Sequence, residues 1–189
     1  YISRALGVTA IGDYGFTSGI VSYFGIIAVS GTMNYAKRET AFNQHDMSAR
    51  SYIFFEILTI RIISVLLVSC AYGMFIMYCD KQYKLLYIIQ FFTVFSWMAD
   101  VTWFFQGMED FKVVTIRNAI VKIICAMAIF LFVKAPNDLW KYTLILSISV
   151  FAGNILVWPC LKKYVRVVNI RRLNIKRHIK GILVMFASV

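Results

Sequence analysis

Charged residues are scarce in this chain. Asp, Glu, Lys and Arg make up 15% of its 189 residues, and only 9 of these residues are acidic. Proline occurs twice and glycine ten times, which excludes collagen-like and low-complexity chains. The sparse charge excludes a disordered polyelectrolyte. A soluble nucleic-acid binder is disfavoured despite the net charge of +11, because the cations stand between long apolar runs.

Cysteine and histidine are too few and too scattered to form a metal centre. The four cysteines show no C-x-x-C spacing and no neighbouring histidine, so neither zinc ligation nor a disulfide framework is indicated. His45 and His178 stand in charged stretches, where we expect solvated side chains. No Gly-rich phosphate loop and no H-E-x-x-H string occurs. The sequence therefore indicates no metal site, no cofactor and no enzyme activity.

Apolar residues are abundant, at 60% of the chain with a mean hydropathy of +0.72, as in membrane proteins. Segments of about 20 apolar residues can cross a bilayer. Their backbone groups must be paired internally, so they form helices, and they are too long for barrel strands. The sequence predicts an all-α polytopic membrane protein with five complete spans, at Tyr14–Ala36, Ser51–Cys79, Leu85–Met108, Val113–Val133 and Tyr142–Leu161.

Both ends of the chain resemble parts of further helices. The chain begins at Tyr1 rather than at Met, and we interpret Tyr1–Gly7 as the end of an earlier helix. His178–Val189 is interpreted as the start of a later helix, because its last nine residues are uncharged but too few to cross a bilayer. We therefore expect a piece of a longer protein.

The basic residues are distributed unequally between alternate loops. Thirteen of the 20 Lys and Arg lie around residues 37–50, 109–117 and 162–180, whereas five lie in the alternate set. Positive charge marks the cytoplasmic side, so the first set is predicted to be cytoplasmic. The segment 162–180 alone holds eight of these cations, enough to attract anionic headgroups.

Ionisable residues also occur inside the predicted spans, where inserting a charge costs about 2.5–3.5 kcal/mol. Glu56 and Arg61 are five residues apart, and so are Arg117 and Lys122, which is a poor spacing for contact along one helix. Their partners must therefore come from neighbouring helices or a ligand. An anion-attracting cavity and interhelical salt bridges are equal alternatives, and a carboxylate also suits a proton or cation site. These residues are Glu56, Arg61, Asp100, Arg117 and Lys122.

Several short strings resemble bacterial polysaccharide flippases of the Wzx type. The most specific are Trp103–Gly107 and Ile116–Asn118. The others follow in the expected order between Tyr1 and about Leu161, namely Ser3–Gly7, Gly12–Phe16, Ile20–Phe24, Lys37–Glu39, Asp138–Tyr142 and Asn154–Leu161.

This resemblance implies membership of the multidrug/oligosaccharidyl-lipid/polysaccharide exporter superfamily, with two six-helix lobes around a central cavity. Such a protein moves undecaprenyl-pyrophosphate-linked oligosaccharides across the bacterial inner membrane by alternating access, for surface polysaccharides such as O-antigen, lipopolysaccharide or capsule. Residues 1–161 would form the N-terminal lobe, 162–180 a basic cytoplasmic linker and 181–189 the start of helix seven. The implied partners are the lipid-linked oligosaccharide, membrane lipids and the polysaccharide polymerase machinery.

The resemblance also gives the recessed side chains candidate roles. Cations would contact the pyrophosphate and acidic sugars, and an amide would bind sugar hydroxyls. The substrate-pathway candidates are Arg4 near the outer mouth, Arg61, Gln106, and Arg117 and Lys122 on the inner side, and the ion-coupling candidates are Asp100 and Glu56. The alternatives are a cation-coupled multidrug antiporter, a membrane-embedded glycan polymerase, for which the outer loops are short, and a structural scaffold.

Overall fold

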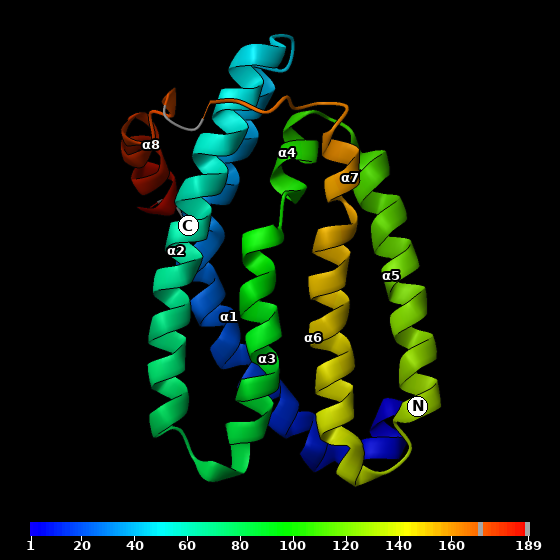
Figure 1. Ribbon diagram of the computed structural model, residues 1–189. Helices are drawn as coiled ribbons and strands as arrows, with labels where there is room; N and C mark the ends of the chain where they lie inside the picture. The colour runs from blue at the N-terminus through cyan, green and yellow to red at the C-terminus, as the bar shows by residue number, and fades with distance from the viewer. Residues whose placement is uncertain (170–171, 188–189) are drawn as a thin grey trace.

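The computed structural model describes residues 1–169 and 172–187, and within them five helical segments are long and apolar enough to cross a membrane (Figure 1). The prediction of an all-α polytopic membrane protein is therefore confirmed. The helices run alternately up and down, as Figure 1 shows. The five segments are Ile2–Phe42, Met47–Tyr78, Lys81–Gly107, Phe111–Phe132 and Pro136–Leu161.

The first segment, α1 (Ile2–Phe42), is interrupted at Gly7, which has φ 79° and ψ 166°. Only glycine adopts this backbone conformation without strain. The interruption coincides with the predicted end of an earlier helix, but the next helix starts here and not at Tyr14. α2 (Met47–Tyr78) then begins after Asp46, whose carboxylate accepts two backbone N–H groups of the first turn.

The predicted span Leu85–Met108 is wrong as a single helix. α3 (Lys81–Ala99) ends at Asp100, whose backbone is extended, with φ −74° and ψ 106°. The short α4 (Thr102–Gly107) follows, and the Asp100 carboxylate accepts the Thr102 backbone N–H at 3.0 Å. An Asp side chain that binds the backbone two residues on favours a turn over a helix.

The last predicted span is also divided. α5 (Phe111–Phe132) is followed by the 3-10 turn η1 (Pro136–Asp138) and by α6 (Leu139–Leu156). Val157 separates α6 from the short α7 (Trp158–Leu161). Pro159 lies in this second piece, where it cannot donate a helical hydrogen bond. The residues interpreted as the start of a later helix form α8 (Lys176–Ala187), which begins before the predicted end of the linker at residue 180, and residues 188–189 lie outside the described residues.

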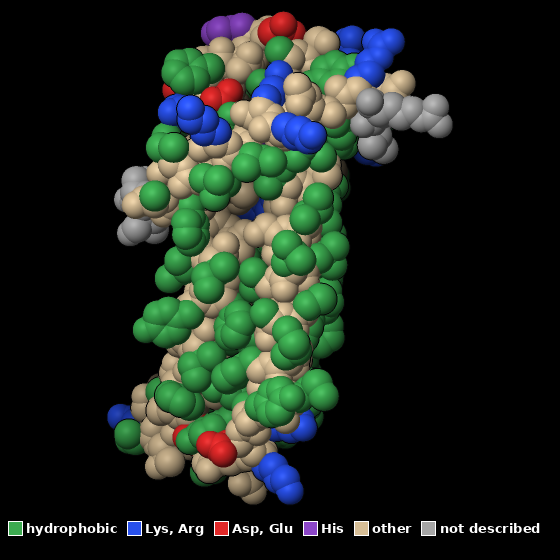
Figure 2. Space-filling model, turned by 90° about the vertical axis from the view of Figure 1, so that its left-hand side faces the viewer, with side chains coloured by type: hydrophobic (Ala, Val, Ile, Leu, Met, Phe, Trp, Pro, Cys, Tyr) green, Lys and Arg blue, Asp and Glu red, His purple; other side chains and the backbone are tan. Residues whose placement is uncertain are grey.

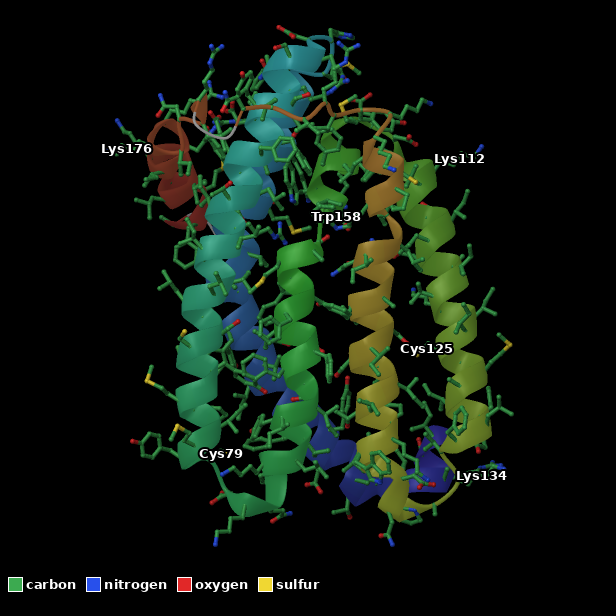
Figure 3. All side chains as sticks on the ribbon, in the orientation of Figure 1. Cys79, Lys112, Cys125, Lys134, Trp158 and Lys176 are labelled. Carbon is green, nitrogen blue, oxygen red and sulfur yellow. The ribbon has the colours of Figure 1, made fainter. Side chains whose placement is uncertain are left out.

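The loops gather at two ends of the bundle. Residues 43–46, 108–110, 162–169 and 172–175 lie together at what we call the basic end, and the chain start lies at the opposite end with residues 79–80 and 133–135 (Figure 1). Figure 3 shows Lys112 and Lys176 at the basic end, and Cys79 and Lys134 at the other. Hydrophobic side chains cover the middle of the face shown in Figure 2, with charged side chains above and below.

The segment between α7 and α8 is bonded to the basic end. Arg50 Nε donates to the Tyr164 carbonyl at 2.9 Å, and the Arg166 backbone N–H donates to Ser51 Oγ at 3.0 Å. The Tyr164 hydroxyl donates to the Asp110 carboxylate, and this bond raises the pKa of Tyr164. The segment is thus attached to both α2 and the α4–α5 loop.

Substituting Gly107→Ala is expected to destabilise the bundle, because the new Cβ would lie 2.7 Å from the Lys37 carbonyl oxygen and 2.7 Å from Thr40 Cβ. Overpacking of this kind costs about 1–3 kcal/mol and would lower the Tm of the purified protein in detergent. Gly73→Ala is the matched control, since nothing in the described part of the chain lies within 4 Å of its Cβ position. Equal Tm values for both variants would contradict the close packing of α4 on α1.

Candidate functional site

The broken end of α3 lies within a spanning segment, and its last carbonyl groups lack helical donors. An unpaired carbonyl costs several kcal/mol in hydrocarbon, so other elements must supply the missing hydrogen bonds. Side chains of α2, α6 and α7 do so: Arg61 Nε donates to Trp97 O at 2.9 Å, Asn154 Nδ2 to Ser96 O at 2.9 Å and Trp158 Nε1 to Ala99 O at 2.8 Å.

Arg61 is also the ionic partner of Asp100. Its side chain is 0% exposed, and its Nη2 donates to Asp100 Oδ2 at 2.9 Å. The carboxylate is 18% exposed and lies at the break of α3. The expectation that Arg61 finds its partner on a neighbouring helix is met by this pair. Its Nη1 is buried and has no hydrogen-bond partner among the described residues.

Arg117 reaches the same break from α5. Its Nη2 donates to Thr102 Oγ1 at 2.9 Å, and its Nη1 donates to Asn154 Oδ1 at 3.3 Å. The side chain passes Gly153, where a Cβ would stand 3.3 Å from Nη1. Both acceptors are neutral, so they do not cancel the guanidinium charge, and Nε is buried without a partner in the described chain.

These side chains form what we call the Asp100 cluster, namely Arg61, Asp100, Thr102, Arg117 and Asn154. It holds two guanidinium groups and one carboxylate, and the carboxylate contacts Arg61 but not Arg117, so a surplus positive charge remains inside an apolar bundle. Arg117 also lines a groove of about 360 Å³ between α5 and α6–α7 whose other lining residues are apolar. A guanidinium in such a place can bind a phosphate with two parallel hydrogen bonds.

Three of the predicted pathway residues lie elsewhere. Arg4 is exposed near the start of α1, at the end opposite to the basic end. Lys122 is exposed on α5, five residues beyond Arg117. Gln106 is half-buried in α4, and its Oε1 has no hydrogen-bond partner among the described residues. The structure therefore joins Arg61, Asp100 and Arg117 but not these three.

Glu56 belongs to a second cluster that attaches α8 to α1 and α2. It is 2% exposed, and its carboxylate accepts the Asn174 backbone N–H at 2.7 Å, Arg177 Nε at 2.9 Å and His178 Nε2 at 2.7 Å. His178 Nδ1 lies 2.9 Å from the Tyr35 hydroxyl. The expectation of a solvated His178 is wrong, because α8 packs on α1 and buries it.

Sequence reasoning missed the neutral members of both clusters. Asn154 is the one amide side chain in the predicted span Tyr142–Leu161, and an amide in hydrocarbon needs partners, so it carried a usable signal. Thr102 and Tyr35 gave no such signal, since threonine and tyrosine occur throughout the spans.

Apolar helices that cross a membrane around a buried charge cluster define a polytopic membrane protein with a polar site at membrane depth. A family model described as "Polysaccharide biosynthesis protein" matches residues 1–188, and the chain belongs to this family. The resemblance to Wzx-type polysaccharide flippases is thereby confirmed at the level of the family.

A curated relative agrees with this assignment. The chain is 25% identical over 196 residues to a Shigella dysenteriae protein named "Putative O-antigen transporter", with all of this chain and 48% of that protein covered. The chain thus spans about half the length of the curated relative it matches. No solved structure matches the chain.

Replacing Arg61 by Leu is expected to destabilise the protein strongly, because Asp100 loses its salt-bridge partner and the Trp97 carbonyl loses its donor. Removing one partner of a buried ion pair costs about 3–5 kcal/mol. The double variant Arg61→Leu/Asp100→Asn should recover part of this loss, as measured by thermal unfolding in detergent. Lys122→Leu, on the exposed face of α5, is the control and should leave Tm nearly unchanged. Additive effects in the double variant would show that the pair does not couple.

Glu56→Gln is expected to loosen α8 from the bundle, because the amide keeps the size of the side chain but loses the charge that Arg177 and His178 contact. Hydrogen bonds to charged groups contribute about 1.5–3 kcal/mol each. Hydrogen–deuterium exchange of residues 176–187 should therefore speed up. Glu39→Gln is the control, since Glu39 pairs only with the half-exposed Arg38 among the described residues at this end. Unchanged exchange in Glu56→Gln would exclude this anchoring role.

Proposed function

We propose that this chain forms one lobe of a flippase that moves undecaprenyl-pyrophosphate-linked oligosaccharides across the bacterial inner membrane by alternating access. Membership of a polysaccharide biosynthesis family supports the polysaccharide part, and the name of the Shigella relative supports transport. The observation that carries the anionic part is the Asp100 cluster, which holds two guanidinium groups but one carboxylate within an apolar bundle.

The surplus charge matches what a pyrophosphate needs. Bringing an anion into a medium of low dielectric constant is costly unless cations and hydrogen-bond donors replace its water. Arg117 meets this need, because it lines a groove and can exchange its neutral acceptors Thr102 and Asn154 for phosphate oxygens. Arg61 cannot exchange partners as easily, since it holds the α3 carbonyl and Asp100. It is therefore assigned a supporting role.

The remaining candidates extend this pathway. Lys122 is an exposed cation midway along α5, where contact with lipid tails would be costly, which favours a polar cavity beside this face. Gln106 Oε1 has no hydrogen-bond partner among the described residues, and we assign it to sugar hydroxyls. Arg4, at the opposite end, suits the outer mouth. By the positive-inside rule we assign the basic end to the cytoplasm, and the segment between α7 and α8 is the proposed linker between lobes.

The engaged carboxylates disfavour the antiporter alternative. A coupling ion needs a carboxylate that can release its partners. Glu56 is bonded to Asn174, Arg177 and His178, and Asp100 is bonded to Arg61 and to the Thr102 backbone. The loop residues 79–80 and 133–135 at the opposite end are short, which disfavours a polymerase with an external active site. A non-enzymatic transporter is the function we propose.

Arg117→Met and Lys122→Met are each expected to impair translocation, because the anionic cargo loses a charged contact. A charge-assisted contact contributes about 1.5–3 kcal/mol, or about tenfold or more in rate. The measurement is the sidedness of lipid-linked oligosaccharide in oriented vesicles, probed with a membrane-impermeant glycan-cleaving enzyme. The vesicles come from cells that lack the gene and carry either the wild type or one variant.

Lys112→Met is the matched control, since Lys112 lies on the same helix but at the basic end (Figure 3). It should restore outward-facing oligosaccharide as the wild type does. If both Arg117→Met and Lys122→Met restore it at normal protein levels, the cation assignment fails. If the wild-type gene does not change sidedness in cells without a redundant transporter, the flippase proposal itself fails.

A further inference from the structure

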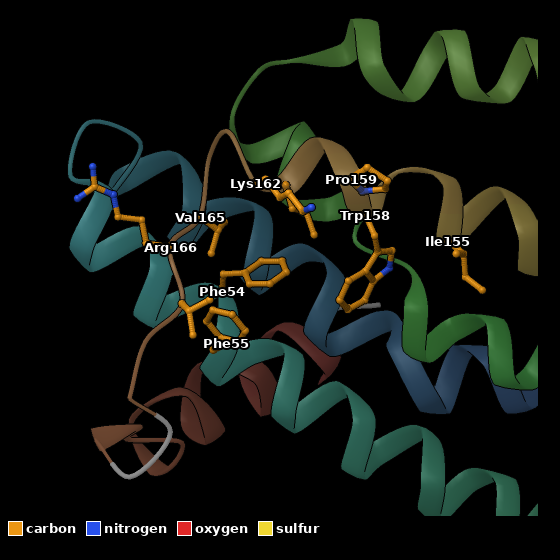
Figure 4. Close-up of a pocket in the computed structure, with 10 residues that line it drawn as sticks. Phe54, Phe55, Ile155, Trp158, Pro159, Lys162, Val165 and Arg166 are labelled. Atoms are coloured by element: carbon orange, nitrogen blue, oxygen red, sulfur yellow. The ribbon is translucent and has the colours of Figure 1, made fainter.

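A groove of about 470 Å³ lies at the basic end, and none of the residues of the Asp100 cluster lines it. It is bounded by α2, the end of α6, α7 and residues 161–167. Figure 4 shows the rings of Phe54, Phe55 and Trp158 together in it, with Lys162 beside them. Arg166 lies at the outer end of the groove, and its guanidinium extends away from the rings (Figure 4).

The walls of this groove are fixed by the break in α3. Trp158 is held by its hydrogen bond to the Ala99 carbonyl, which the break leaves free. The Phe54 ring packs on Trp103 and Phe104 of α4, with centroids 5.6 and 5.1 Å apart. Because the Trp158 ring is held by the Ala99 carbonyl and the Phe54 ring by two buried rings of α4, the groove does not need to be opened by a ligand.

The groove combines apolar walls with positive charge at its rim. Ile155 is 45% and Trp158 is 36% exposed, so both present apolar surface to the outside. Lys162 and Arg166 are exposed, and no acidic residue lies among the described residues that line the groove. Segment 162–180 carries eight Lys and Arg and no Asp or Glu. Cations at this level of a membrane attract anionic headgroups.

We propose that this groove binds an anionic phospholipid of the surrounding bilayer. An acyl chain lies against Phe55, Ile155 and Trp158, and the headgroup phosphate is bound by Lys162 and Arg166. Tryptophan at this position suits the boundary between acyl chains and headgroups. Because Lys162 and Arg166 belong to the segment between α7 and α8, the bound lipid stabilises the position of that segment on α2. This lipid is a ligand separate from the transported cargo.

Native mass spectrometry of the purified protein tests this proposal, with phosphatidylglycerol and phosphatidylethanolamine as probes. The wild type should retain phosphatidylglycerol in preference. Lys162→Gln/Arg166→Gln should weaken that retention by about fivefold for each cation removed. Ile155→Trp, which fills the groove from α6, should weaken retention of both lipids. Lys112→Gln/Lys176→Gln removes the same charge at the same end, outside the groove, and should change nothing (Figure 3).

A second measurement uses the wild-type groove itself. Brominated phosphatidylglycerol should quench the part of the tryptophan fluorescence that Trp158→Phe removes. Equal lipid loss in both charge variants would overturn the proposal in favour of diffuse attraction to the basic end. Unquenched Trp158 fluorescence would also overturn the proposal, and would mean that protein covers the groove. The same conclusion follows if Lys162→Gln/Arg166→Gln and Ile155→Trp retain as much phosphatidylglycerol as the wild type does. Neither result depends on transport, so the proposed function is tested separately.

Discussion

The rest of the structure depends on one constraint, which is that the carbonyl groups freed where α3 breaks must find donors at membrane depth. Three other helical elements supply them, through Arg61, Asn154 and Trp158. Each donor then has a further effect. Arg61 pairs with Asp100, Asn154 accepts from Arg117, and Trp158 forms a wall of the lipid groove. The break thus places both the candidate substrate site and the proposed lipid site.

The two buried carboxylates have different consequences. Glu56 is surrounded by donors and joins α8 to α1 and α2, so it fixes the position of α8 on this bundle. Asp100 has one guanidinium in direct contact and a second nearby, and its cluster retains positive charge. Glu56 therefore anchors α8, and the Asp100 cluster attracts the anion. Because the two sites share no residue, the contact of α8 with the bundle can change while the Asp100 cluster stays intact.

Much of the fold could be predicted, because bilayer thickness and backbone pairing determine the number and type of spans. The interruption at Asp100 could not, since the donors for the freed carbonyl groups lie far away in sequence. The interruption at Val157 had a local signal, because Pro159 follows two residues later. Glu56, Arg61 and Asp100 have ionic partners on other elements, as expected of recessed charges, whereas Lys122 is exposed. Helix spacing does not reveal which residues pair. Asp100 pairs across 39 residues with Arg61, and Glu56 pairs across 122 with His178.

The central claim is that the surplus positive charge of the Asp100 cluster binds the pyrophosphate of the cargo. The most direct measurement is the affinity of undecaprenyl pyrophosphate for the purified protein and two variants. Arg117→Met removes positive charge and should weaken binding, whereas Asp100→Asn removes negative charge at almost constant shape and should strengthen it. Changes in the same direction, or no change in either variant, would contradict the account.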